Sequence, residues 1–204
     1  MDLLSSLSLL SQYITAILSI MFFLQTKKTF AKWLALLLII TVIVESIGAY
    51  CIITEKPVFL HHQVYILLEL IIIRKMYNGL IKDKAWLKLS NFFLIAFLVT
   101  WFLILYNKSF FYTAIIIGAI NIGLLVFLYL RELLLSDEIL NYKKMLSFWV
   151  SVGFLVFYLP SIPFFSLVGY MKSRDLFPVL NILIIIMNII ISFGLIWSKK
   201  KEEY

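Results

Sequence analysis

The sequence predicts an all-α fold, a polytopic membrane bundle of seven transmembrane helices that uses residues 1–204 as a single domain. Composition is the first observation behind this prediction: 63% of the residues are hydrophobic and only 14% are charged. Soluble domains contain about 45–50% apolar and about 25% charged residues. The second observation is that apolar runs of about 18 residues or more recur, each long enough to cross a hydrocarbon core of about 30 Å. A soluble globular protein is therefore excluded.

The individual spans follow from the apolar runs between clusters of charge. They are expected at residues 3–25, 34–54, 60–77, 91–107, 111–131, 146–166 and 176–198. The third span is the weakest, because its uninterrupted apolar part is short and it carries His61, His62 and Glu69.

The distribution of basic residues predicts the direction of the chain. Of the 18 lysines and arginines, 14 fall in connections on one side and 4 on the other, and the bias alternates across every expected span. Lys and Arg accumulate on the cytoplasmic side of membranes. We therefore expect the N-terminus outside and the C-terminus in the cytoplasm. The minority set is Lys56, Lys108, Lys172 and Arg174.

The net charge of +7 is scattered through these short connections. That pattern suits orientation against anionic lipid head groups and argues against nucleic-acid binding. The excess of Ile, Lys, Asn and Tyr is typical of an AT-rich bacterial gene, so the expected location is the bacterial cytoplasmic membrane, with the lipid bilayer as the principal partner. The sequence leaves a homo-oligomer open.

Two of the expected cytoplasmic connections are more than turns. Residues 78–90 open with Asn78-Gly79, a turn signal, and then mix apolar and charged side chains. Residues 131–144 begin with Arg131-Glu132 and continue in the same mixed manner. Both segments are typical of amphipathic chain lying at the head-group level. The alternative is a docking surface for a cytoplasmic protein partner.

Two glutamates, Glu45 and Glu69, lie inside otherwise apolar spans. An acid at the bilayer centre costs roughly 2.5–3.5 kcal/mol on insertion scales, so such a residue usually faces a protein interior. Counted from the outer ends of their spans at 1.5 Å per residue, both carboxyls lie about 13 Å deep, and Asn121 lies about 15 Å deep. We therefore expect these three side chains to meet in one layer near the midplane.

Helical spacing extends this layer into a polar stripe. His61, Tyr65 and Glu69 follow at intervals of four residues, and His62 precedes Glu69 by seven. On the sixth span Tyr158 stands shortly before Pro160 and Pro163, which loosen a helix and free backbone carbonyls. These features predict an outward-opening cleft with the glutamates at its floor. The candidate ligand- or proton-binding residues are His61, His62, Tyr65, Glu69, Glu45, Asn121 and Tyr158. The alternative is that they only hydrogen-bond one helix to another.

Recognisable catalytic chemistry is absent from the sequence. No serine–histidine, cysteine–histidine or HExxH arrangement occurs, and no glycine-rich phosphate loop is present. The single cysteine, Cys51, excludes a disulfide framework and a cysteine-based metal motif. We therefore expect no catalytic residues, no metal and no cofactor, and the sequence favours a protein that is not an enzyme.

Several short motifs resemble a known group of proteins. Residues 45–50, with the pattern E-x-x-G-x-Y, resemble a segment of an uncharacterised family of small bacterial seven-helix integral membrane proteins. Tyr65 and Glu69, the run 129–134 and the run 148–153 are similar to the same family. Ser147 stands where that family often has a proline. The resemblance implies the fold and the orientation and brings no activity with it.

Three functions remain open at this point. The leading expectation is a non-enzymatic sensory, regulatory or accessory module that couples a membrane-embedded site to a cytoplasmic partner. The alternative is a small proton- or cation-coupled transporter or channel that uses Glu45 and Glu69. The third is an intramembrane lipid enzyme with His61, Tyr65 and Glu69 as acid–base groups, which the lack of a nucleophile disfavours.

Overall fold

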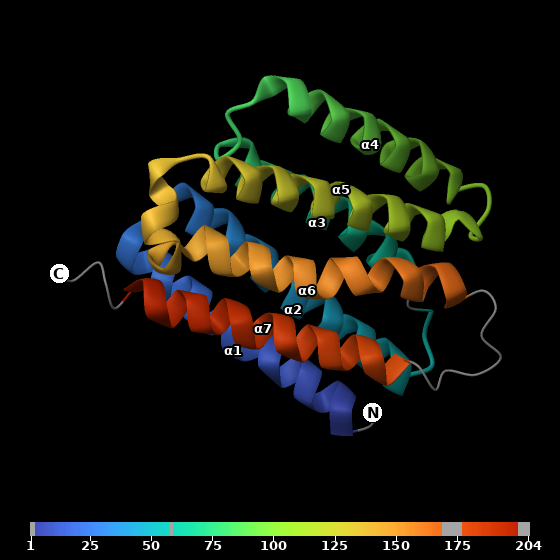
Figure 1. Ribbon diagram of the computed structural model, residues 1–204. Coiled ribbons are helices and arrows are strands. Elements are labelled where there is room, and N and C mark those ends of the chain that lie inside the picture. Colours follow the sequence, from blue (N-terminus) through green and yellow to red (C-terminus); the bar gives the residue numbers. More distant parts are fainter. Residues whose placement is uncertain (1–2, 58, 169–176, 200–204) are drawn as a thin grey trace.

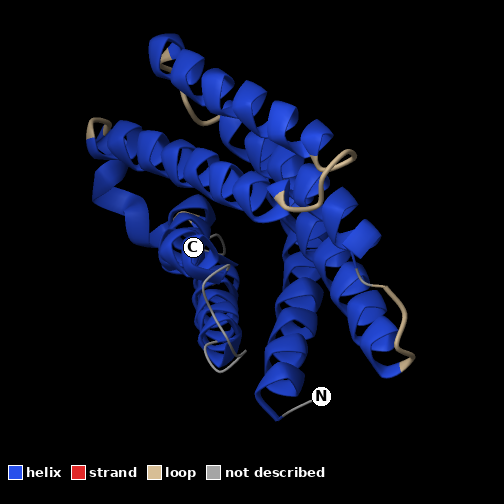
Figure 2. Cartoon of the chain, turned by 90° about the vertical axis from the view of Figure 1, so that its right-hand side faces the viewer, coloured by secondary structure: helices blue, strands red, loops and turns tan. Residues whose placement is uncertain are grey.

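The computed structural model describes residues 3–57, 59–168 and 177–199, and their regular structure is entirely helical (Figure 2). In chain order the elements are α1 (Leu3–Thr26), α2 (Thr29–Ile53), α3 (Phe59–Asn78), α4 (Lys84–Leu103), α5 (Phe110–Leu134), the 3-10 helix η1 (Asp137–Lys144), α6 (Leu146–Leu167) and α7 (Phe177–Lys199). No strand occurs in the described ranges, so the predicted all-α class is confirmed.

Six helices of the described chain are long and apolar enough to cross a membrane, and α3 is the α-helix that is not among them. The chain is therefore a multi-pass membrane protein. The exception agrees with the sequence, because α3 contains His61, His62, Glu69 and Arg74 within 20 residues.

The helices form a ring with one helix outside it. Along the ring α1 packs on α2, α2 on α3, α3 on α5, α5 on α6, α6 on α7, and α7 closes it on α1. α4 packs mainly against α5 at the edge of the bundle (Figure 1). Hydrogen bonds support the closure between α1 and α7: the Thr15 and Ser192 hydroxyls lie 2.9 Å apart, and Asn181 donates to Ser5 at 3.2 Å.

Most helix limits agree with the predicted spans within a few residues, and two starts do not. α2 begins at Thr29 rather than residue 34, and α4 begins at Lys84 rather than residue 91 and ends at Leu103 rather than residue 107. Hydropathy marks where a chain becomes apolar, whereas a helix continues through charged turns such as the one containing Lys84 and Lys88. Half of the expected 78–90 connection is therefore the first part of α4.

One end of the bundle, hereafter the basic end, carries the α1–α2, α3–α4 and α5–α6 connections and the end of α7 (Figure 1). Lys27, Lys28, Lys82, Lys143 and Lys144 all lie there. Of the minority set, Lys56 and Lys108 lie in connections at the opposite end, while Lys172 and Arg174 fall outside the described residues. So do Lys200 and Lys201.

Packing is densest in the half of the bundle next to the basic end. The buried residues of α2 are Ala31, Leu34, Ala35, Leu37 and Leu38 near its start, and only Gly48 beyond them. In α3 the buried residues are Leu70, Ile72, Ile73, Met76 and Tyr77 near its end, and only Gln63 before them. Near the basic end α6 and α7 also approach closely, since a Cβ added at Gly194 would lie 2.4 Å from Cβ of Trp149. The opposite half is more loosely covered.

Candidate functional site

The Glu69 carboxyl is the centre of a hydrogen-bonded group that joins three helices. Its Oε1 accepts a hydrogen bond from Tyr65 of α3 at 2.8 Å and another from Tyr158 of α6 at 2.7 Å. The Tyr65 hydroxyl also lies 3.0 Å from Oγ1 of Thr41 on α2. We call Thr41, Tyr65, Glu69 and Tyr158 the carboxyl cluster. Because α6 lies across the ring from α2 and α3, this cluster connects opposite walls of the bundle.

The residues that α3 contributes to this cluster lie on its inward face. The exposed stripe of the helix consists of Leu60, Val64, Leu68 and Ile71. His61, Tyr65 and Glu69 follow one position behind three of these residues, and all three are half-buried. A helical rotation of about 100° per residue therefore separates a lipid-compatible face from a polar face directed at α2 and α6.

Glu45 of α2 lies near this cluster without a hydrogen bond to it among the described residues. Its carboxyl interacts electrostatically with Glu69 and with His61. The exposed residues around it are Ile43 and Ile47, whereas Glu45 itself is half-buried. Glu45 and Glu69 therefore lie close enough to interact, and His61 supplies a titratable partner for Glu45.

The two histidine rings contact each other in a tilted arrangement near the same group. The ring centroids of His61 and His62 are 4.9 Å apart, and the Nε2 atom of His61 is buried with no hydrogen-bond partner in the described part of the chain. No group of three or more His, Cys, Asp or Glu side chains suited to a metal ion occurs among the described residues. The pair therefore adds ionisable groups to the site.

Asn121 belongs to a different polar group. Its Oδ1 accepts a hydrogen bond from Ser90 of α4 at 2.8 Å, and Ser90 in turn accepts one from Arg74 at 3.1 Å. Arg74 also contacts Asn91. The expected layer of three side chains thus separates into two groups, because α5 turns Asn121 toward α4 rather than toward Glu69. Counting residues from a helix end gives depth but not direction.

Between the carboxyl cluster and the basic end, α6 is hydrogen-bonded to α3 a second time and also to α5. The Tyr77 and Ser151 hydroxyls lie 2.7 Å apart, and those of Tyr129 and Ser147 also lie 2.7 Å apart. Tyr77 and Ser151 are both fully buried. Tyr77 follows Glu69 by eight residues, which is about 12 Å along continuous helix. α3 therefore links the carboxyl cluster to the basic end through a rigid segment.

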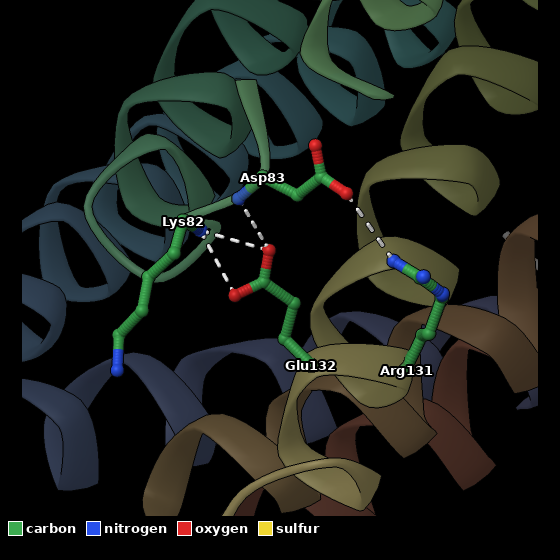
Figure 3. A network of polar contacts seen from close by, with 4 residues as sticks. All are labelled: Lys82, Asp83, Arg131 and Glu132. Carbon is green, nitrogen blue, oxygen red and sulfur yellow. Dashed lines mark hydrogen bonds and ion pairs between the residues drawn. The ribbon is translucent and has the colours of Figure 1, made fainter. Parts of the chain in front are cut away.

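At the basic end the α3–α4 connection is held by the end of α5 (Figure 3). Both carboxylate oxygens of Glu132 accept the backbone N–H of Lys82 at 2.9 Å, and one also accepts that of Asp83 at 2.7 Å. Arg131 forms an ion pair with Asp83 at 3.6 Å. We call these four residues the loop clamp. The carboxylate lies where α4 begins, a position that the helix dipole stabilises.

The candidate residues of the sequence analysis did not include Thr41, Ser90, Ser151 or the loop clamp. For a single polar residue in an apolar helix, the sequence does not predict which side chain will be its hydrogen-bond partner. Two of them had a usable clue. Thr41 precedes Glu45 by four residues and Ser151 precedes Tyr158 by seven, so each shares a helical face with a candidate residue. A cavity lies at the basic end, lined by residues of the α1–α2 turn, the start of α6 and the end of α7.

Comparisons with known proteins add no relative from which a role could be transferred. The chain matches no family model, no curated protein and no solved structure. The functional argument therefore depends on the residues and their geometry alone.

Proposed function

We propose that this protein is a non-enzymatic sensory or regulatory module of the bacterial cytoplasmic membrane, in which the state of Glu69 is coupled to a cytoplasmic partner. The single observation that supports this is the pair of tyrosine hydrogen bonds to Glu69, one from α3 and one from α6. A carboxyl held between two helices changes its hydrogen bonds when it gains or loses a proton or a cation.

The proposal includes α3 as a seventh span, with the N-terminus outside and the basic end in the cytoplasm. A helix of 20 residues is about 30 Å long, which matches the hydrocarbon core. Three polar side chains of α3, Tyr65, Arg74 and Glu69, are hydrogen-bonded to α2, α4 and α6 respectively. The excess of described basic residues at one end supports the orientation. Membership of the small bacterial seven-helix family stays part of this proposal.

Signal transmission would run along α3. Hydrogen bonds to an ionised carboxylate are roughly twice as strong as those to a neutral group. Neutralising Glu69 would therefore weaken the contact between α3 and α6 at the carboxyl cluster. The displacement would reach Tyr77 and then the α3–α4 connection, where the loop clamp sets the position of Lys82 and Asp83.

The partner surface would be the combined face of residues 78–90 and 131–144. The loop clamp joins these two segments, so they form one surface rather than two. Leu134, Leu135 and Leu140 are exposed there by 67%, 75% and 85%. These leucines supply the apolar contacts that either the head-group region or a protein partner requires.

Labelling of a cysteine at Gly79 tests the coupling. A Cβ at this position meets no atom within 4 Å, so Gly79→Cys in a Cys51→Ser background leaves the packing unchanged. In inside-out vesicles, the rate of reaction with a membrane-impermeant maleimide is measured from about pH 5 to about pH 8. The reaction rate of maleimides itself depends on pH, so every rate is divided by that of free cysteine.

The normalised rate should change with pH in this background and become constant when Glu69→Gln is added. Glu55→Gln, in the α2–α3 connection, is the matched control and should leave the pH profile intact. A pH profile that is the same in the Glu69→Gln protein and in its parent would exclude the proposal.

A proton- or cation-coupled carrier is the second candidate, and one observation favours it. His61, Glu45 and Glu69 interact electrostatically in series from the non-basic end toward the middle of the bundle. Such a series could load and release a proton. Reconstituted vesicles should then show a proton flux that Glu45→Gln and Glu69→Gln each abolish. Flux that persists in both variants would rule this mechanism out.

A further inference from the structure

The buried face of α1, which packs on α2 and α7, is mainly polar. Four of the six buried residues of this helix are Ser8, Gln12, Thr15 and Ser19. Across the contact with α7, Asn188 is also buried. A polar group inside a membrane bundle costs free energy unless it has a hydrogen-bond partner or binds a ligand, so each of these side chains needs a partner.

Two oxygen atoms of this group have no hydrogen-bond donor among the described residues. They are Oε1 of Gln12 and Oδ1 of Asn188, and the two residues are only 4% and 1% exposed. The Asn188 amide is oriented by its nitrogen, which donates to the backbone oxygen of Ile184 at 2.8 Å. Exchanging the two ends of this amide would bring two acceptors together, so the unpaired atom is the oxygen.

Helix geometry places these two residues at one level. α1 and α7 both run toward the basic end (Figure 1). The hydroxyls of Thr15 and Ser192 are in contact. Gln12 precedes Thr15 by three residues, and on α7 the step from Asn188 to Ser192 is four. At 1.5 Å per residue these steps are about 4.5 Å and 6 Å, and both keep the side chains on one helical face. The two amides therefore lie opposite each other, about one turn before the hydroxyl contact.

The neighbouring hydroxyls supply further oxygens rather than further hydrogens. Thr15 donates to the backbone oxygens of Ser11 at 2.8 Å and of Asn188 at 3.3 Å. The hydrogen between the Thr15 and Ser192 hydroxyls, which lie 2.9 Å apart, therefore comes from Ser192. Both hydroxyl hydrogens are thus used, and the two amide oxygens gain no donor from them.

A group of oxygen atoms without a negative charge is complementary to a monovalent metal cation. Hard cations bind oxygen ligands, and carbonyl oxygens replace the hydration shell of potassium in channel filters. Calcium sites normally include carboxylates, and the described residues of α1 and α7 contain no Asp or Glu. The expectation that the chain binds no metal came from the lack of cysteine-based and catalytic motifs, which a sodium or potassium ion does not require.

We propose that the contact between α1 and α7 binds a sodium or potassium ion between the amide oxygens of Gln12 and Asn188. The hydroxyl oxygens of Thr15 and Ser192 lie about one turn away along both helices. The inference is independent of the sensory function, because the carboxyl cluster belongs to α2, α3 and α6. A bound cation would join the first helix of the chain to the last one and stabilise the closed ring.

The test compares cations on the purified full-length chain in a neutral detergent. Thermal unfolding is followed by tryptophan fluorescence in sodium chloride, potassium chloride or choline chloride at equal concentrations, so that the ionic strength stays constant. Sodium or potassium should raise the unfolding temperature in a saturable manner, because a ligand that binds the folded state stabilises it by mass action. Choline is too large to enter between two packed helices and should have no such effect.

Variants of the two amides locate the site. Gln12→Met and Asn188→Leu keep side chains of similar size without the oxygen, and each should weaken the apparent cation affinity about tenfold, the loss expected for one contact with a charged group. Gln12→Glu adds a negative charge and should strengthen the affinity about tenfold. Asn181→Leu is the matched control on α7. Its amide already donates to Ser5 at 3.2 Å, so its removal should leave the cation affinity unchanged.

Equal unfolding temperatures in the three salts would overturn the proposal and would assign the two amides to a bridging water or to a hydrogen bond with each other. A sodium or potassium effect that is as strong in Gln12→Met and Asn188→Leu as in the unmodified chain would place the cation elsewhere and would also overturn it. Stabilisation by one or both metals that is lost in these two variants and kept in Asn181→Leu would confirm the site.

Discussion

α3 is hydrogen-bonded to α6 at two places, and the strength of only one of these bonds depends on the charge of an ionisable group. Near the basic end the bond joins Tyr77 to Ser151, both fully buried and both uncharged. In the middle of the bundle it joins Tyr158 to Glu69, a half-buried carboxyl. A tyrosine–serine bond keeps its strength across neutral pH, whereas a bond to a carboxyl depends on the charge of its acceptor. One contact therefore serves as a fixed anchor and the other as a responsive one.

Truncating the anchor should have the largest effect on stability. Tyr77→Ala removes a fully buried aromatic ring that packs on Phe30 and Tyr129, and it should lower the free energy of unfolding by about 3–5 kcal/mol. Tyr50→Ala is the control in the loosely covered half. Because Tyr50 is 58% exposed, its removal should change the free energy by about 0.5 kcal/mol or less. Unfolding in mixed micelles of increasing sodium dodecyl sulfate measures both, and equal losses would contradict the packing difference.

Removing single hydroxyls sharpens the comparison. Tyr158→Phe deletes one donor to Glu69 and should cost about 1.5–3 kcal/mol when the carboxyl is ionised, and less when it is protonated. Its destabilisation should therefore increase with pH. Tyr77→Phe should cost about 0.5–1.5 kcal/mol at every pH, because neither partner changes charge. The measurement is the free energy of unfolding at several pH values, and parallel pH profiles for the two variants would remove the distinction between anchor and responsive contact.

The smallest change concerns the loop clamp, which should alter local rather than global stability. Glu132→Gln replaces a carboxylate that accepts two backbone N–H groups. We expect a loss of about 1 kcal/mol, confined to the connection. Hydrogen exchange at Lys82 and Asp83 should accelerate about fivefold, while exchange at Tyr77 stays constant. Faster hydrogen exchange along the whole of α3 would contradict this expectation, because it would show that the loop clamp stabilises the entire helix, including the Tyr77–Ser151 contact.

The sequence predicted the helical class well, because long apolar segments separated by charge leave few alternatives in lipid. It also placed Glu45, Tyr65 and Glu69 on inward faces, since helical periodicity alone determines which residues share a face. It could not orient Asn121 or pair Tyr77 with Ser151. Those contacts depend on how one helix is rotated against another. A hydroxyl or amide side chain can hydrogen-bond many kinds of partner, so its identity does not predict which one it meets.

The contact between α1 and α7 has a consequence for how the protein is made. Ser8, Gln12, Thr15 and Ser19 are buried along α1, and Thr15 is bonded to Ser192 and to the backbone of Asn188. Synthesis proceeds from the N-terminus, so the first helix enters the bilayer long before the last one exists. Until α7 has been synthesised, Thr15 lacks these two hydrogen-bond partners, and the ring of helices cannot close.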